Sequence, residues 1–283
     1  MLNHQLVKDK LVALQERYTR FQIEHFENWE IWAEASEKVY HRQPVDENKI
    51  PKAFHNELRA MKILIEMENL GEFDWNSPKL REAFAAISGG VFHQFFGETV
   101  VEIAITLAGA IKPKTLLEIG AGNGKLTRLA CKAMKSKKNY FPLVVTESKP
   151  VINKVIDKLK EDFPEVKINP FLWDIKESPS KELLASITPP ALLYERYTIT
   201  YAGISSIANI AKAADILVLG DWLSITGKIY GYDKAFSKIG AKTLLYSDVK
   251  AELDKYYSNY YFFDKEAQEA IKSPYISILI AWK

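Results

Sequence analysis

The chain of 283 residues holds 38 Lys and Arg against 36 Asp and Glu, which leaves a formal net charge of +2. A charge this close to zero creates no global field for nucleic acid or anionic lipid. The single cysteine excludes an internal disulfide and a cysteine-based zinc site, and no pair of histidine and acid has metal-site spacing, so we expect no metal. No window approaches about 18 consecutive apolar residues, so we expect no membrane span and a cytoplasmic protein.

Residues 1–111 predict helices and no strand. Apolar side chains recur there at roughly helical spacing, as in Leu11, Leu14, Tyr18 and Phe21. The segment is rich in aromatic residues and ends in a more apolar stretch, "GETVVEIAITLAGAI". We expect it to form an all-helical N-terminal cap that contributes to substrate binding.

The rhythm changes in residues 112–283, where short β-rich runs alternate with charged helical stretches. This alternation predicts a doubly wound α/β domain, with a seven-stranded, mostly parallel sheet covered by helices on both faces. The ligand of such a sheet binds at the carboxyl ends of the strands. The expected strands are 115–120, 142–147, 166–171, 191–196, 215–220, 242–247 and 275–283.

Three glycines follow the first expected strand, in "LLEIGAGNGKLT" at 116–127. The loop does not fit a P-loop, because Leu126 stands where a hydroxyl is required. It is also incomplete as a dinucleotide loop, because Lys125 takes the place of the third glycine of G-x-G-x-x-G. Glu118 would repel a pyrophosphate close by, but it would attract a ligand that carries positive charge.

The same segment resembles the first motif of the class I S-adenosylmethionine-dependent methyltransferases, roughly hh-(D/E)-h-G-x-G-x-G, and the resemblance covers residues 112–283. It implies a Rossmann-like domain that binds S-adenosyl-L-methionine and releases S-adenosyl-L-homocysteine. Glu147 would hold the ribose and Asp174 the adenine, with Trp173 packed on the ring. The cofactor-binding residues that we expect from the resemblance are Glu118, Gly120, Ala121, Gly122, Gly124, Glu147, Ser148, Trp173, Asp174 and Glu195.

The fourth expected strand ends in "YERYTITYAG" and lacks the (N/D)-P-P-(Y/F) motif of enzymes that methylate nitrogen in nucleic acids and proteins. We therefore expect a small-molecule substrate that is methylated at oxygen or carbon. A carboxylate or an imidazole can act as the base, although Glu195 paired with Arg196 and a satisfied His93 are the structural alternatives. The candidate catalytic residues are Glu195, His93 and Tyr197, and the candidate substrate-binding residues are Arg196, Tyr201 and Trp222.

Three other functions stay open. The glycine loop also resembles that of ribosomal RNA adenine dimethylases, but the missing motif and the near-neutral charge count against nucleic acid. An aminopropyl transferase of this fold would carry an acid where Asn123 stands. The third alternative is a cofactor-binding subunit without catalysis.

Ten Lys and Arg lie between Lys125 and Lys160. They form either solvated helix faces or a docking surface for an acidic partner such as a carrier protein, and a homodimer is also open.

Overall fold

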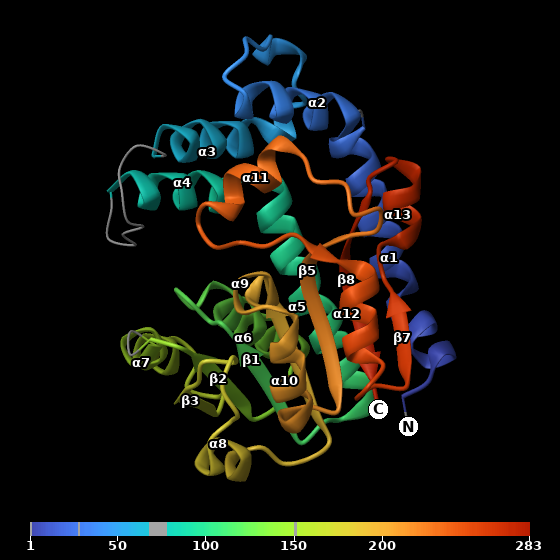
Figure 1. Cartoon of the computed structure of the whole chain (residues 1–283). Coiled ribbons are helices and arrows are strands. Elements are labelled where there is room, and N and C mark those ends of the chain that lie inside the picture. The colour runs from blue at the N-terminus through green and yellow to red at the C-terminus, as the bar shows by residue number, and fades with distance from the viewer. Residues whose placement is uncertain (1, 28, 68–77, 150–151) are drawn as a thin grey trace.

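The computed structural model describes residues 2–27, 29–67, 78–149 and 152–283. In this part of the chain an eight-stranded sheet forms the centre of the molecule, in the order β3-β2-β1-β4-β5-β8-β7, and β6 pairs with β5 (Figure 1). The pairs among β1 to β6 are parallel, whereas β8 is antiparallel to β5 and β7 is antiparallel to β8. The strands are β1 (Thr115–Ile119), β2 (Leu143–Glu147), β3 (Ile168–Leu172), β4 (Ala191–Arg196), β5 (Ile216–Ser224), β6 (Leu244–Leu245), β7 (Asn259–Phe262) and β8 (Tyr275–Trp282).

This largely parallel sheet confirms the predicted fold class, with one strand more than expected. The additional strand is β7, an edge strand whose four residues are all half-buried and therefore show no alternation. It forms by pairing with β8, a long-range contact that local sequence does not report. The strand expected at 242–247 is reduced to Leu244–Leu245, because α12 begins at Tyr246.

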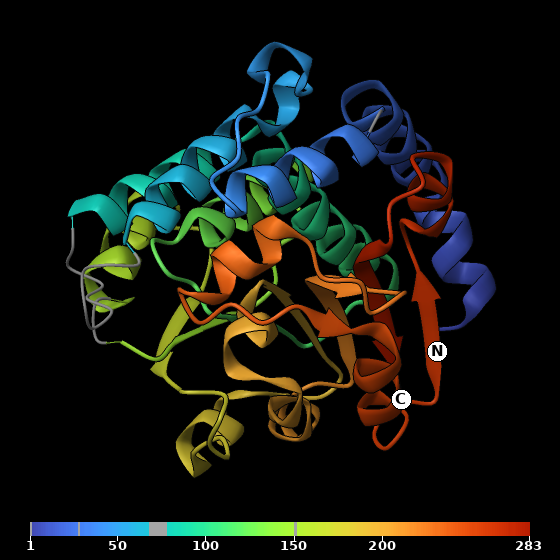
Figure 2. The same ribbon diagram turned by 45° about the horizontal axis from the view of Figure 1, so that its top comes forward.

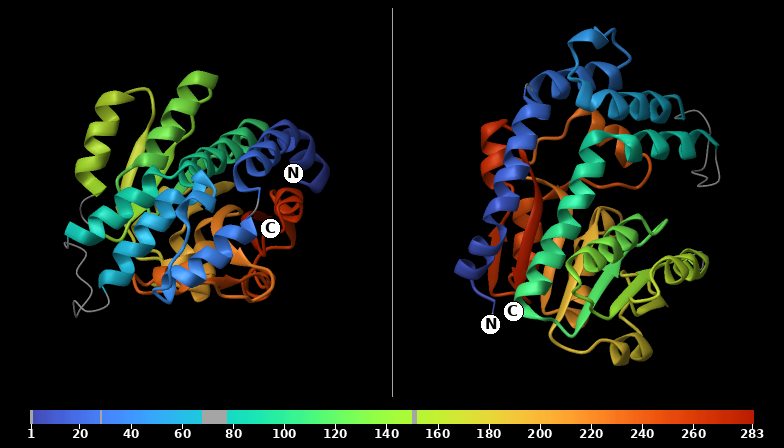
Figure 3. Two further views of the ribbon diagram at one scale, coloured as in Figure 1. Left: turned by 90° about the horizontal axis from the view of Figure 1, so that it is seen from above. Right: turned by 180° about the vertical axis from the view of Figure 1, so that it is seen from behind.

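Helices cover both faces of the sheet. Side chains alternate along β1, so that Leu116 joins the core on one face and Leu117 the core on the other. Helices α1, α5, α6 and α7 cover the first face, where Figure 3 shows α1 beside α5, and α8, α9, α10 and α12 cover the second. Their bounds are α1 (His4–Phe26), α5 (Val91–Ile111), α6 (Lys125–Lys137), α7 (Ile152–Asp162), α8 (Lys181–Ser186), α9 (Thr198–Ala202), α10 (Ile207–Ala213) and α12 (Tyr246–Leu253).

The remaining helices form a layer above the sheet, which Figure 2 shows obliquely, with its top turned forward. Gly231 lets α11 approach α2, because an added Cβ would lie 2.0 Å from the carbonyl oxygen of Ser36. The layer therefore combines N-terminal helices with one from the C-terminal half. Its members are α2 (Trp29–Tyr40), α3 (His55–Glu66), α4 (Pro78–Gly89) and α11 (Gly231–Ser237), and α13 (Lys265–Ala270) packs beside α1.

Helix α5 joins this layer to the sheet. It packs on β4 and β5. By length and composition its window His93–Ile111 is apolar enough to cross a membrane, but 56% of that window is buried inside the protein, as in a core helix. Helix α5 ends at Ile111, after which the sequence predicts a domain boundary, and the hydrophobic core continues past this residue, so the boundary stays a prediction.

Candidate functional site

The glycine loop between β1 and α6 has the backbone that the sequence pattern indicates. Gly120, Gly122 and Gly124 have φ values of +67°, +54° and +74°, a region that favours glycine. A Cβ added at Gly124 would lie 2.4 Å from a methyl group of Val155, so this glycine serves helix packing. A Cβ at Gly122 would meet no atom of the described residues within 4 Å. The open side of the loop is therefore at Gly122, where a ligand can approach bare backbone.

Glu147 at the end of β2 lies against this loop. Its Oε2 accepts a hydrogen bond of 2.8 Å from the backbone N–H of Gly122. Its Oε1 accepts from the backbone N–H and the hydroxyl of Ser148, at 2.7 and 2.9 Å. Because β1 and β2 are neighbours in the sheet, the acidic residue at the end of β2 lies against the glycine loop that follows β1.

Glu118 on β1 is 1% exposed and lies beneath the loop. The hydroxyl of Tyr194 donates to its Oε2 at 2.8 Å, while its Oε1 has no hydrogen-bond partner among the described residues. Burial raises the pKa of Glu118 to about 7, against the lowering effect of Tyr194, Thr127 and the Arg196 charge. A buried carboxylate with one free oxygen fits the ammonium group of the predicted cofactor.

Of the two residues beyond β3 that were predicted to contact the adenine, Asp174 is exposed but Trp173 is buried. Asp174 is exposed beyond β3 and accepts from the backbone N–H of Lys176 at 3.0 Å. Trp173 instead turns into the core with Ile175, and its indole N–H donates to the carbonyl of Glu177 at 3.0 Å. This placement contradicts the predicted packing of Trp173 on adenine, because a core side chain does not reach the ligand. Leu172, 56% exposed and paired in register with Glu147, is the apolar side chain at that edge.

Glu195 on β4 is fully buried and its two oxygens are occupied. They accept from the backbone N–H groups of Thr198 and Gly220, at 2.7 and 2.8 Å. Burial raises the pKa of Glu195 to about 7. The predicted roles as a base and as a cofactor ligand do not agree with this arrangement, because the carboxylate already holds the backbone of the β4–α9 turn. Asp221 acts similarly, accepting from the N–H of Ile199 at 3.1 Å.

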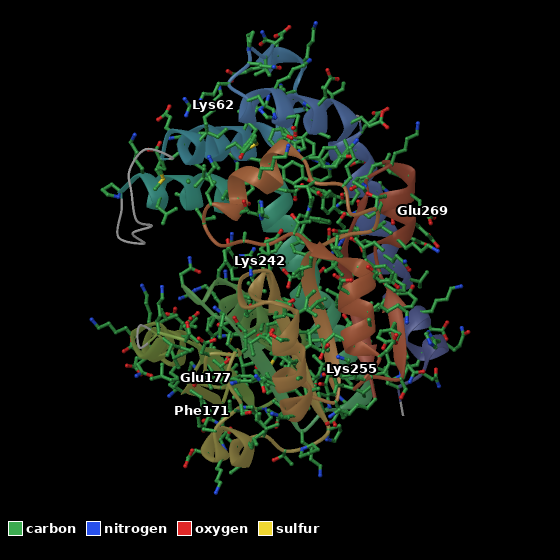
Figure 4. The ribbon with its side chains drawn as sticks, viewed as in Figure 1. Lys62, Phe171, Glu177, Lys242, Lys255 and Glu269 are labelled. Atoms are coloured by element: carbon green, nitrogen blue, oxygen red, sulfur yellow. The ribbon has the colours of Figure 1, made fainter. Side chains whose placement is uncertain are left out.

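A cavity of about 250 Å³ lies between the helical layer and the carboxyl ends of β4 and β5. Aromatic side chains from both sides form its walls, and Lys242, at the junction of the two parts in Figure 4, lines it as well. The remaining candidate residues of the sequence analysis all meet here. The predicted residues in its wall are His93, Arg196, Tyr197, Tyr201 and Trp222, joined by Trp32, Phe54, Glu57 and Tyr232.

The cavity adjoins the glycine loop through the β4–α9 turn. Tyr197 has a φ of +61°, and the hydroxyl of the next residue, Thr198, donates to the carbonyl of Ile119 at 3.3 Å. A Cβ on Gly120 would lie 2.4 Å from that hydroxyl. The turn is therefore the shared wall of loop and cavity.

The positive charge of Arg196 acts on Glu118 beside the glycine loop and on His93 in the cavity. Its Nη1 donates to the carbonyl of His93 at 2.9 Å, in space left by Gly97, where a Cβ would lie 2.8 Å from that nitrogen. The guanidinium charge contributes to lowering the pKa of both Glu118 and His93, although burial is the largest influence on each. The Arg196 guanidinium therefore favours negative charge on a ligand that occupies the cavity.

Glu57 is a site residue that sequence reasoning missed. It is 7% exposed, lines the cavity, and its Oε1 lies 3.5 Å from Nε2 of His93. The available signal was its position on α3: an acid in register with Ala60, Met61 and Leu64, which are all buried, belongs to the apolar face of that helix.

Comparison with known proteins gives one family and a set of structures. A family described as histidine-specific, SAM-dependent methyltransferase matches residues 95–235. No curated protein matches the chain. The C-methyltransferase domain of the citrinin polyketide synthase is similar at 14% identity with a TM-score of 0.61, over 87% of this chain and 68% of that one. The CurJ carbon methyltransferase gives 13% and 0.63 over 88% and 70%, and the DszA carbon methyltransferase 13% and 0.62 over 82% and 66%.

Proposed function

We propose that this class I S-adenosylmethionine-dependent methyltransferase methylates a small molecule, at oxygen or carbon, in the cavity beside the glycine loop. One observation carries the proposal: the turn at Tyr197 and Thr198 borders both the glycine loop and the cavity. A cytoplasmic location, as expected from the sequence, is part of the proposal.

The described residues fit the cofactor. The open backbone at Gly122 suits its methionine part and Glu118 its ammonium. Glu147, which unlike Glu195 is only half-buried, suits its ribose, and the exposed Asp174 and Leu172 suit its adenine. When bound, the cofactor supplies an electrophilic methyl group on a sulfonium. The chain holds and orients both reactants and excludes water.

The size and walls of the cavity support a small acceptor over RNA. A cavity of about 250 Å³ with largely aromatic walls suits a compact, largely apolar molecule. On the lysine-rich helix α6, Arg128 pairs with Asp162 of α7 at 2.6 Å and Lys135 pairs with Glu165, beyond α7, at 3.1 Å. These ion pairs reduce any attraction for an acidic carrier protein or RNA. Binding of the free small molecule is therefore the function that we favour, and the homodimer stays a prediction.

A second candidate is the methylation of an amine or imidazole nitrogen. The description of the matching family as histidine-specific favours it, as does a buried carboxyl group, Glu57, in an aromatic cavity. A nitrogen acceptor must lose its proton before its lone pair can accept the methyl group, and a buried carboxyl group is a candidate to take that proton.

The test is a titration with S-adenosylmethionine followed by an acceptor screen that detects S-adenosylhomocysteine by mass spectrometry. The acceptors are phenol, catechol, acetylacetone, cyclohexanol, histidine and a structured RNA. Turnover of phenol, catechol or acetylacetone supports oxygen or carbon methylation, and turnover of histidine alone supports the second candidate. Methylation of RNA, or cofactor binding without any turnover, contradicts the proposal.

A further inference from the structure

We propose that Glu57 and His93 form one proton-sharing pair that removes the proton of the acceptor, so that the acceptor is an acidic O–H or C–H compound such as a phenol or a 1,3-dicarbonyl compound. This inference rests on the proposed function and narrows its substrate class. His93 is the catalytic residue that contacts the acceptor, and Glu57 is a positioning residue that acts through it.

The pair is built from two helices of the layer above the sheet. Glu57 projects from α3 and His93 from the first turn of α5, and the carboxyl Oε1 lies 3.5 Å from Nε2 of the ring. Gly90, just before α5, leaves room for the acid, since a Cβ there would lie 2.9 Å from the same Oε1. Neither oxygen of Glu57 has a hydrogen-bond partner among the described residues. Both side chains line the cavity, so the carboxyl group faces the ring and the acceptor space.

Burial sets the protonation of the pair. It raises the pKa of Glu57 to about 8 and, together with the charges of Arg196 and Lys125, lowers that of His93 to about 3. Near neutral pH the pair therefore holds one extra proton, on the acid. Groups this close titrate as a unit, and an apparent pKa belongs to the pair. The other titratable and charged groups in the same cavity wall are Arg196, Tyr197, Tyr201, Tyr232, Asp233 and Lys242.

The pair becomes a base when that proton has left to solvent. With the Nε2–H of His93 directed at the ionised Glu57, Nδ1 of the ring accepts the proton of the acceptor: the O–H or C–H bond breaks and its electron pair stays on the acceptor atom. The ionised Glu57 stabilises the imidazolium, which burial alone would disfavour. The electron pair on the acceptor forms the bond to the methyl carbon, and the C–S bond breaks with its electrons going to sulfur. Arg196 stabilises the transient negative charge from beside His93.

The strength of this base limits the acceptor. A phenol such as that of tyrosine has a pKa of about 10, roughly two units above that of the pair. A group as weakly acidic as water, at about 15.7, would transfer its proton roughly a millionfold less favourably than the phenol. The cavity therefore selects acidic acceptors, and an unactivated alcohol is a poor one.

A first experiment needs no acceptor. The protein, which has five histidines, is labelled with ¹⁵N-histidine and titrated from about pH 6 to about pH 10. The ring signals missing from a His93→Gln variant belong to His93. We expect them to follow an ionisation near pH 8 that disappears in Glu57→Gln, persists in Glu57→Asp, and is unchanged in Glu66→Gln, an exposed acid on the same helix. A His93 ring that does not respond near pH 8, or that responds equally in Glu57→Gln, overturns the pair.

A second experiment follows turnover. With phenol as acceptor, kcat/KM should rise with pH and level off above about pH 8, and Glu57→Gln should lower kcat by about a hundredfold, without the pH 8 step and with unchanged cofactor affinity. Glu57→Asp should recover part of the rate. Faster methylation of cyclohexanol than of phenol, or a Glu57→Gln profile like that of wild type, overturns the inference. If the wild-type protein methylates none of the acceptors, the proposed function is refuted. The histidine titration would still show whether Glu57 and His93 titrate as a pair.

Discussion

At the scale of single residues, the glycines of the loop serve different purposes. Gly124 makes room for Val155 of the neighbouring helix, and Gly120 makes room for Thr198, whereas Gly122 faces open space. Only Gly122 is therefore a position where a new side chain would displace a ligand without disturbing the packed chain.

The first prediction concerns this glycine. Gly122→Arg should abolish S-adenosylmethionine binding, because the side chain fills the approach to the backbone. The matched control is Gly227→Arg, since Gly227 also has a positive φ, of +72°, with its nearest atom at 3.7 Å. Calorimetric titration should show binding lost only in the first variant, although both lose about 1 kcal/mol of stability to backbone strain. Equal affinity in both variants would refute the loop assignment.

The second prediction concerns Glu118. Its pKa of about 7 means that much of it is protonated below neutrality, and it must ionise to pair with an ammonium group. Cofactor affinity should therefore rise by up to about tenfold per pH unit between about pH 5 and about pH 7. Binding should also release a proton, detectable as a heat that depends on the buffer. Glu118→Gln should bind more weakly and without this pH dependence; a pH dependence that survives in it would assign the effect to another group.

At the scale of elements, the β4–α9 turn is the part that joins cofactor loop and cavity. Two buried carboxylates, Glu195 and Asp221, accept backbone N–H groups of the turn and of β5. Tyr197 is held there with a φ of +61°. Such a conformation costs about 1–3 kcal/mol in a non-glycine residue and persists because the surroundings impose it.

The third prediction follows from that architecture. Glu195→Gln should lower the free energy of unfolding by about 1–3 kcal/mol, because an amide has one acceptor oxygen for two backbone donors. Chemical denaturation measures this loss, and Glu161→Gln on an exposed helix face should show none. Full stability with a large loss of turnover would restore Glu195 as a base.

At the scale of the whole molecule, buried acids couple stability to pH; besides three glutamates, burial raises the pKa values of Asp221, Asp233 and Asp264. Burial raises the pKa values of Glu57, Glu118 and Glu195 from the usual 4.5 to about 8, 7 and 7. At a pH between the usual pKa of 4.5 and the raised pKa of each glutamate, the native state binds more protons than the unfolded state. The free energy of unfolding therefore falls as the pH rises from about 4.5 to about 8.

The fourth prediction is a melting temperature that decreases between about pH 5.5 and about pH 8.5 at constant ionic strength. Glu57→Gln should remove the upper part of that decrease, since Glu57 has the highest of the three pKa values. A melting temperature that rises over this range would contradict the protonated state of the buried acids.

By itself the sequence determined the α/β class, the glycine loop and the acids near the ends of β1 and β2, because strand rhythm and loop chemistry are local. It also named four residues of the cavity, Arg196, Tyr197, Tyr201 and Trp222, since strand ends converge at one edge of the sheet, and a fifth, His93, from its setting among aromatic residues. It did not separate Arg196 in the cavity from Glu195 in the core. The side chains of adjacent strand residues point to opposite faces, and only the position of the neighbouring strands decides which face is open.

Tertiary structure alone decided the rest. Trp173 turned into the core instead of the ligand site, and β7 formed only because β8 offered an edge. The proximity of Glu57 and His93 depends on how α3 and α5 pack over the sheet. Burial then sets their pKa values, because the solvation of a charge depends on everything around it and on no property of its own residue type.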